Sequence, residues 1–144
     1  MNCRNDYSLP EVVEVRMMDC RDLQRGIMQN HIAGVENLVS CPMEDIPIYP
    51  HAKCQGVYNS SNGGTTQRTT LEFRTNKPPM VTKGKAFAVR TPDGLWYLIG
   101  SKEKPWPSIE VVDDKGTTHG DPRVKTVKVT FESLATLIPV TILL

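Results

Sequence analysis

The fold class is decided by the stretch Ala86-Phe87-Ala88-Val89-Arg90-Thr91-Pro92-Asp93-Gly94-Leu95-Trp96-Tyr97-Leu98-Ile99-Gly100. Residues typical of β-strands flank a Pro-Asp-Gly turn on both sides. Proline presets φ for a bend, aspartate tolerates tight turn geometry, and glycine adopts a positive φ at low cost. The stretch therefore predicts a β-hairpin, and it indicates a β-rich protein.

Other segments show the alternation of apolar and polar side chains that is typical of half-buried strands. In residues 11–18 the alternation puts Val13, Val15 and Met17 on one face. Two later segments repeat it with Thr69, Leu71 and Phe73, and with Val127, Val129 and Phe131. Residues 108–112 and 138–144 also read as strands, the latter with Pro139 at its start or at a sheet edge. We expect about seven to nine strands separated by turn signals.

One segment favours a helix. Residues 19–30 begin with Asp19, which can act as an N-cap, and place Leu23, Ile27 and Met28 on one helical face. Gly26 weakens this prediction, because glycine lowers helix stability. Strands in this number, with at most one or two short helices, predict a mainly β protein, either a β-barrel or a β-sandwich. The length of 144 residues suits a single domain over residues 1–144.

Composition excludes several classes of protein. The formal net charge is +1, and no basic stripe is present, so we do not expect nucleic acid to be the main partner. No apolar run approaches the roughly 18 residues of a membrane span, and no apolar segment follows Met1 as in a signal peptide. Four cysteines, Cys3, Cys20, Cys41 and Cys54, match no common zinc spacing. We expect reduced, partly buried thiols in a protein made in the cytoplasm.

Three sequence features that could carry chemistry are weak. His51 and Cys54 have the spacing of two soft metal ligands, but a second pair is missing nearby. Residues 113–121 hold three carboxylates and His119 without the pattern of a calcium loop, and Asn62-Gly63-Gly64 lacks the rest of a phosphate-binding loop. We therefore expect no catalytic residue, no metal site and no cofactor, and predict that the protein is not an enzyme.

Three aromatic side chains are the candidates for a protein–protein interface. Trp96 and Tyr97 alternate on one strand, so one ring can pack in the core while the other faces a neighbouring subunit. Trp106 lies between two prolines and would be held rigidly as a surface anchor. Aromatic rings of this kind are enriched where proteins bind one another.

The second half of the chain resembles a particular group of proteins. The resemblance rests on Leu71-Glu72-Phe73-Arg74, Pro78-Pro79, Thr91-Pro92-Asp93-Gly94, Trp96-Tyr97-Leu98-Ile99-Gly100, Lys104-Pro105-Trp106-Pro107, Gly120-Asp121-Pro122 and Leu137-Ile138-Pro139. These elements are similar to uncharacterised small proteins of phages and prophages from gut Bacteroides-like bacteria, over residues 65–144. The resemblance implies a virion or assembly protein of the head, neck or tail, with no catalytic residues to transfer.

The first hypothesis is therefore a phage or prophage structural protein. It would form a homo-oligomer, a ring or tube, with itself and with other virion proteins, and would reside in the virion after assembly in the host cytoplasm. The first alternative is a small bacterial β-barrel adaptor or ligand-binding module with an apolar pocket. The second alternative is a metal-dependent hydrolase that uses His51, Cys54, His119 or Asp121.

Overall fold

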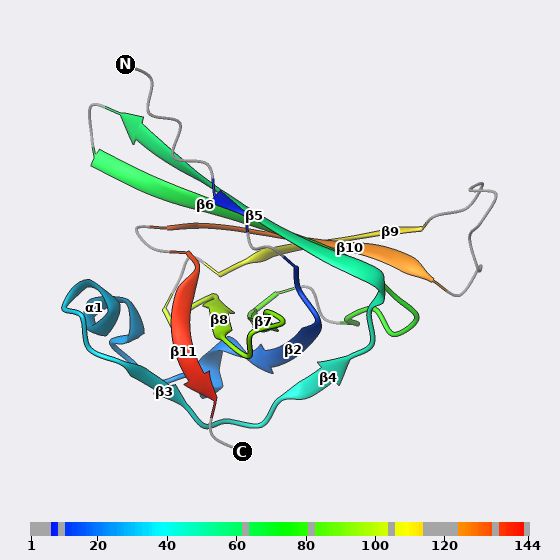
Figure 1. The fold of residues 1–144 in the computed structure, drawn as a ribbon, viewed down its shortest axis with the longest axis horizontal. Coiled ribbons are helices and arrows are strands. Elements are labelled where there is room, and N and C mark those ends of the chain that lie inside the picture. The colour runs from blue at the N-terminus through cyan, green and yellow to red at the C-terminus, as the bar shows by residue number, and fades with distance from the viewer. Residues whose placement is uncertain are drawn as a thin grey trace.

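Two antiparallel-rich sheets form the body of the protein in a computed structural model that describes residues 7–8, 11–61, 64–80, 83–103, 106–113, 124–133 and 136–142 (Figure 1). The upper sheet has the order β1-β5-β6-β10-β9, with bounds Tyr7–Ser8, Tyr49–Ser61, Gly64–Thr75, Lys125–Ser133 and Ser108–Asp113. The lower sheet has the order β3-β11-β8-β7-β2-β4, with bounds Asn37–Val39, Ile138–Ile142, Trp96–Ile99, Lys85–Arg90, Glu14–Asp19 and Glu44–Ile46.

The architecture confirms a mainly β protein of the sandwich type. Both sheets are open within the described residues, so the barrel alternative does not apply. The described chain has 11 strands, more than the seven to nine expected. The additional strands include β1, β3 and β4, which are two or three residues long, too short to leave a periodic signal in the sequence.

The Pro92-Asp93-Gly94 hairpin is confirmed as the link between β7 and β8. The Gly94 N–H donates to the Thr91 carbonyl oxygen at 2.9 Å, and the Thr91 N–H donates to the Leu95 carbonyl oxygen at 3.0 Å. Gly94 has φ of 87°, which completes a three-residue turn with a bulge. The Thr91 hydroxyl also donates to the Asp93 carboxylate.

The main core lies between the two sheets. The alternation in β6 and β10 is confirmed, since Leu71, Phe73 and Phe131 are at most 1% exposed while the intervening Glu72 and Lys128 are exposed. The lower sheet contributes Val15, Phe87, Val89 and Ile99 to the same cluster. Phe73 and Phe87 meet across the interface, with ring centroids 6.3 Å apart.

A second core covers the other face of the lower sheet, which the sequence did not predict. Its buried members are Met18, Cys20, Leu23, Ile27, Val39, Ala86, Ala88, Leu98, Ile138 and Val140. Strand β7 is consequently buried on both faces, with alanines on one face and Phe87 and Val89 on the other. On β2, Met18 is buried against the second core, so the face opposite Val15 is only partly polar. Val13, which was expected to share the core-facing side with Val15, is 38% exposed.

The helix expected over residues 19–30 is split in two. Asp19 caps a 3-10 turn, η1 (Cys20–Asp22), by accepting a hydrogen bond from the Arg21 backbone N–H at 2.9 Å. The α-helix, α1 (Ile27–Ile32), starts only after Gly26, whose φ of 82° a helix cannot accommodate. Leu23 and Ile27 still face the second core, as the apolar pattern predicted.

Candidate protein–protein interface

A groove of about 500 Å³ opens at one side of the lower sheet, and we call it the β8–β11 groove. Three segments line it, which are the turn from α1 to β3 (His31 and residues 34–36), the start of β8 (residues 95–97), and β11 (residues 139–141). The parallel pairing of β3 with β11 and the antiparallel pairing of β11 with β8 bring these segments together. The groove therefore depends on contacts between distant parts of the chain.

The first wall of the groove is built by the C-terminal end of α1. The Gly34 N–H donates to the His31 carbonyl oxygen at 3.1 Å, and the Val35 N–H donates to the Asn30 carbonyl oxygen at 2.8 Å. Gly34 has φ of 76°, so the end of α1 has the hydrogen bonds of a Schellman motif. This turn leaves the Val35 side chain 55% exposed at the groove.

Asn37 fixes this wall to the sheet. Its side chain is 1% exposed, and its amide Nδ2 donates to the Ile27 carbonyl oxygen at 2.9 Å. Its Oδ1 accepts a hydrogen bond from Asn30 Nδ2 at 3.2 Å. Because buried polar groups of this kind are costly to leave unpaired, Asn37 ties the first turn of α1 to the start of β3.

The side chains of Trp96 and Tyr97 lie on opposite faces of β8, and both residues line the groove. Trp96 packs partly against the second core and Tyr97 partly against the core between the sheets, so both rings contact a core, whereas the expectation was one ring in the core and the other facing a neighbouring subunit. The guanidinium carbon of Arg16 lies 4.8 Å from the centroid of a Trp96 ring, within cation–π distance. Both aromatic rings are half-buried, so each is held by the core while part of it remains accessible.

An ion-pair network holds Arg16 in this position. Glu14 pairs with Arg16 at 3.1 Å and with Arg90 at 2.8 Å, and Arg16 pairs with Asp45 at 2.9 Å. Partial burial raises the pKa of Glu14, but hydrogen bonds from Arg90 and Arg16 outweigh it and hold the pKa below its usual value. Glu14 is therefore ionised at neutral pH and orders the cation beside Trp96.

Aliphatic side chains are exposed in and beside the groove. Leu95 is 54% exposed at its rim, and Ile32 is 68% exposed next to the lining residue His31. Leu38 is 46% exposed and lies beside the lining residue Thr141 in the β3–β11 ladder. Together with Val35 these residues form what we call the aliphatic rim. Two members of this rim, Val35 and Leu95, line the groove itself, and exposed apolar side chains at a groove are typical of interaction surfaces.

Trp106 does not join the other two aromatic residues. Its indole Nε1 donates to the Lys102 carbonyl oxygen at 3.1 Å, and its side chain packs partly against the second core. Ring carbons of Trp106 lie 3.7 Å from the position that a Cβ on Gly84 would occupy. Trp106 therefore covers the segment that leads into β7, away from the groove.

Of the residues considered for metal or nucleophilic chemistry, only Cys54 has a side chain that the structure describes. Cys54 is 2% exposed in the core, and burial raises the pKa of its thiol to about 12. Burial likewise raises the pKa of Cys20 to about 11. The side chain of His51, together with His119 and Asp121, lies outside the described residues. Within the described ranges, no three His, Cys, Asp or Glu side chains gather as metal ligands.

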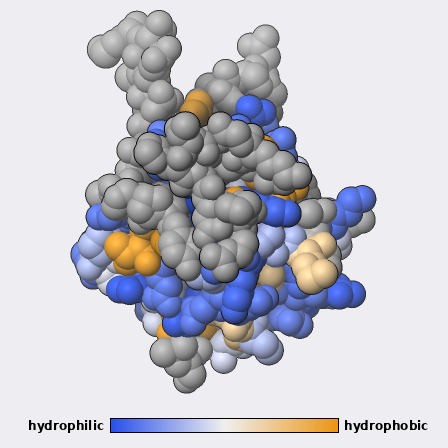
Figure 2. Space-filling model, turned by 90° about the vertical axis from the view of Figure 1, so that its right-hand side faces the viewer, coloured by the Kyte–Doolittle hydropathy of each residue, from blue (hydrophilic) through white to orange (hydrophobic). Residues whose placement is uncertain are grey.

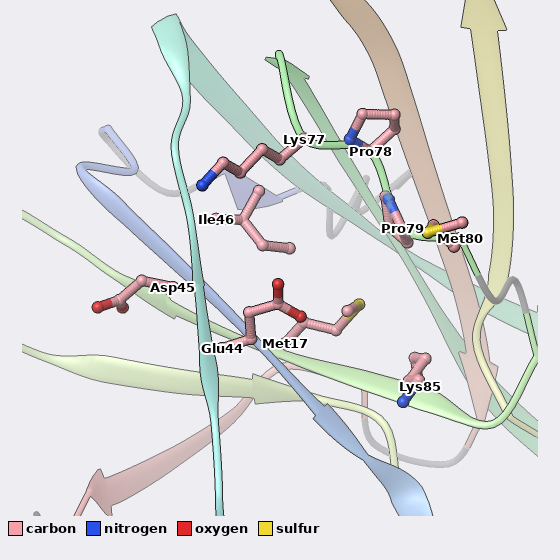
Figure 3. A pocket seen from close by; sticks show the side chains of 9 residues that line it. All are labelled: Met17, Glu44, Asp45, Ile46, Lys77, Pro78, Pro79, Met80 and Lys85. Atoms are coloured by element: carbon pink, nitrogen blue, oxygen red, sulfur yellow. The ribbon is translucent and has the colours of Figure 1, made fainter.

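A second groove, of about 510 Å³, lies at the opposite side of the lower sheet. In Figure 3 the side chains of Met17 and Glu44, from β2 and β4, lie opposite the segment of residues 77–80, and Lys85 of β7 also lines the groove. Met80 of that segment is 98% exposed. Among the coloured atoms of the face drawn in Figure 2, hydrophilic residues predominate and apolar residues lie in separate spots.

Comparison with protein-family models, curated proteins and solved structures finds no significant match to this chain. Among the described residues, no helix has the length and apolar character to cross a membrane.

Of the residues that line the β8–β11 groove, the sequence identified Trp96 and Tyr97 but not Val35, Leu95 and Pro139. Gly34 after an apolar helical segment was the one local signal for the turn that exposes Val35.

Proposed function

We propose that this protein is a non-enzymatic structural component of a phage or prophage particle, in the head, neck or tail. It acts by assembling with copies of itself and with other virion proteins, first in the host cytoplasm and then in the virion. The β8–β11 groove with its aliphatic rim is the observation that carries the proposal. Burial of an apolar surface of this kind against a partner lowers the free energy of the system.

The construction of the groove supports a role in protein contacts. Its aromatic residues are anchored by core packing and by the Arg16 network, so little conformational freedom is lost when a partner binds. Half-buried aromatic residues beside an arginine resemble the hot spots of interfaces. Two of the segments that carry the resemblance to phage proteins, residues 96–100 and 137–139, contribute Trp96, Tyr97 and Pro139 to the lining of the groove.

The experiment measures the mass of the native protein by light scattering after size exclusion, over a range of concentrations. We expect oligomers, and we expect Leu95→Lys combined with Val35→Lys to shift the protein to smaller species. Met80→Lys is the matched control, because Met80 is also exposed and apolar but lies at the opposite side of the lower sheet. A protein that stays monomeric at high concentration, alone and with virion partners, would overturn the proposal.

The groove in Figure 3 favours a second candidate, a small adaptor or ligand-binding module. Its volume of about 510 Å³ lies in the range of small-molecule sites, and its lining combines apolar Met17, Ile46 and Pro79 with charged groups. A monomeric protein in which Ile46→Lys abolishes the binding of a small ligand would favour this candidate over assembly.

A further inference from the structure

The outer face of the upper sheet, which is turned away from the lower sheet, carries an ordered row of charges (Figure 1). Residues that pair directly across antiparallel strands point to the same face of a sheet. One such row crosses β5, β6, β10 and β9 and consists of Lys53, Glu72, Lys128 and Glu110, in that order. All four residues are exposed. The sign of the charge therefore alternates from strand to strand, at a spacing of about 4.8 Å.

The neighbouring rows of the same face continue this order. The next row along the strands is uncharged and consists of Gln55, Thr70, Thr130 and Ser108. The row after it places Arg68 of β6 beside Glu132 of β10, with side chains 53% and 46% exposed. The signs on β6 and β10 are consequently reversed between the two charged rows.

The charges of the first row are available to a partner. Among the described residues, none of its four side chains forms an ion pair, although each lies beside an opposite charge in the sheet. Long exposed side chains lose rotamer freedom when they pair with one another, which explains why such pairs on a free surface are weak. A surface with balanced, regularly placed charges is suited to a partner that presents the complementary pattern.

A second copy of the chain presents this complementary pattern. A two-fold axis that runs parallel to the strands, above the outer face and between β6 and β10, places β9 of the second copy over β5 and its β10 over β6. Lys53 of each copy then faces Glu110 of the other, and Glu72 faces Lys128. Arg74, the outward residue beyond this row on β6, faces an uncharged residue of the second copy.

We propose that two copies of this protein pack through the outer faces of their upper sheets in this arrangement. In the second charged row, Arg68 of each copy faces Glu132 of the other, so all charges of both rows meet an opposite charge. The uncharged row between them brings Thr70 opposite Thr130, two short side chains that permit close approach. Packed sheets lie about 10 Å apart, a gap that lysine, arginine and glutamate side chains can span from both sides. This inference rests on the proposed function as a self-assembling protein, and it adds a second contact surface to the β8–β11 groove.

The order of the charges selects the direction of the axis. A two-fold axis that crosses the strands through the first row would place each charge of that row over the same charge. An axis that crosses the strands through Thr70 and Thr130 would leave Lys53 and Glu110 without a charged partner. Because like charges placed opposite each other cost free energy, the axis parallel to the strands is favoured over both. The resulting contact is isologous and leaves the lower sheet of each copy uncovered.

Charge reversal at the centre of the face tests the inference. In Glu72→Lys the new lysine faces Lys128 of the other copy, and in Lys128→Glu the new glutamate faces Glu72 of the other copy. We expect each variant alone to associate at least about tenfold more weakly than the parent, with an unchanged circular dichroism spectrum. In a mixture of the two variants these contacts again join opposite charges, so we expect the mixed pair to associate about as strongly as the parent. Analytical ultracentrifugation at low ionic strength measures all three, since salt screens exposed charges.

Glu44→Lys and Lys77→Glu are the matched controls. They make the same changes of net charge at exposed positions of the second groove, so they reveal any attraction that arises from net charge alone. We expect both controls and their mixture to associate like the parent. Oligomers that Glu72→Lys and Lys128→Glu leave unchanged would overturn the inference and leave the proposed function standing. Weak association that persists in the mixture would also overturn it, because the axis would then have another direction.

A combination with the groove variant separates the two contact surfaces. We expect the protein with Leu95→Lys and Val35→Lys to remain a dimer through the outer face, and the addition of Glu72→Lys to convert it to a monomer. A groove variant that is already monomeric where the parent forms oligomers would overturn the inference and support the groove alone. A parent protein that stays monomeric at high concentration, alone and with virion partners, would overturn both the inference and the proposed function.

Discussion

Strands β7 and β10 both lie inside a sheet, yet they are buried in different ways. In β10 an apolar side chain facing the core alternates with a polar one facing water, so only half of the strand is constrained by packing. In β7 both faces are covered, and the four residues Ala86, Phe87, Ala88 and Val89 are all 0% exposed. The lower sheet is therefore the interior layer of the protein, and the upper sheet is an outer layer with one solvent-exposed face.

The largest effect should come from exchanging lysine and alanine in the two strands, in opposite directions. Lys128 of β10 is exposed, and we expect Lys128→Ala to change the free energy of unfolding by less than about 0.5 kcal/mol. We expect Ala88→Lys in β7 to lower it by more than about 4 kcal/mol, because the site has no room for the chain or water for the charge. Urea denaturation measures both, and similar values would contradict the two-sided burial of β7.

A smaller loss of stability is expected from a substitution at Gly100, which packs against Ala86 of β7. Its φ is 131°, and a Cβ at this position would lie 2.6 Å from the Ala86 Cβ and 3.2 Å from the Ala86 Cα. Gly100→Ala should lower the free energy of unfolding by about 2–4 kcal/mol through strain and overpacking. Gly94→Ala is the control, since its φ of 87° is also positive but its Cβ would meet open space. Its cost should be about 1–2 kcal/mol.

The smallest effect concerns ion pairs and compares a half-buried network with an exposed pair. Glu14→Gln removes the carboxylate between Arg16 and Arg90 and should lower the free energy of unfolding by about 1–2 kcal/mol at pH 7. Glu132→Gln breaks a pair with Arg68 whose side chains are 53% and 46% exposed, and it should cost less than about 0.5 kcal/mol. Thermal melts in low and high salt measure both.

The stabilising contribution of Glu14 should depend on pH in a definite direction. The pKa of Glu14 is lower in the folded protein than its ordinary 4.5, so its stabilising contribution is present above about pH 4.5. The contribution is lost as the pH falls through the folded pKa. The stability difference between the parent and Glu14→Gln should therefore shrink in acid, and a difference that stays constant down to pH 2 would contradict the role of the carboxylate.

The sequence predicted the elements whose stability is local. The β7–β8 hairpin follows from Pro92-Asp93-Gly94, and the alternation in β6 and β10 follows from burial on one face only. The second core was missed because its members in β7 are alanines, which give no periodic signal beside Phe87 and Val89. Gly26 was expected only to weaken the helix over residues 19–30, and its positive φ instead divides that segment in two.

The candidate interface could be predicted only in part. Trp96 and Tyr97 were identified because they are large aromatic residues on one strand. Val35 and Pro139 reach the same groove through the parallel pairing of β3 with β11, a long-range contact that neither segment encodes by itself. The role of Arg16 depends on its position over Trp96, which needs the β2–β7–β8 order of the lower sheet.

The parallel ladder between β3 and β11 also sets the timing of folding. It joins Asn37 to Val140, so the lower sheet cannot be completed until residues 138–142 have been synthesised. Hairpins such as β5–β6 and β7–β8 form from neighbouring residues and can fold earlier, because closing a short loop costs less entropy. The β8–β11 groove is therefore among the last surfaces to exist on a newly made chain. Copies emerging from adjacent ribosomes cannot engage one another through this groove before each has folded.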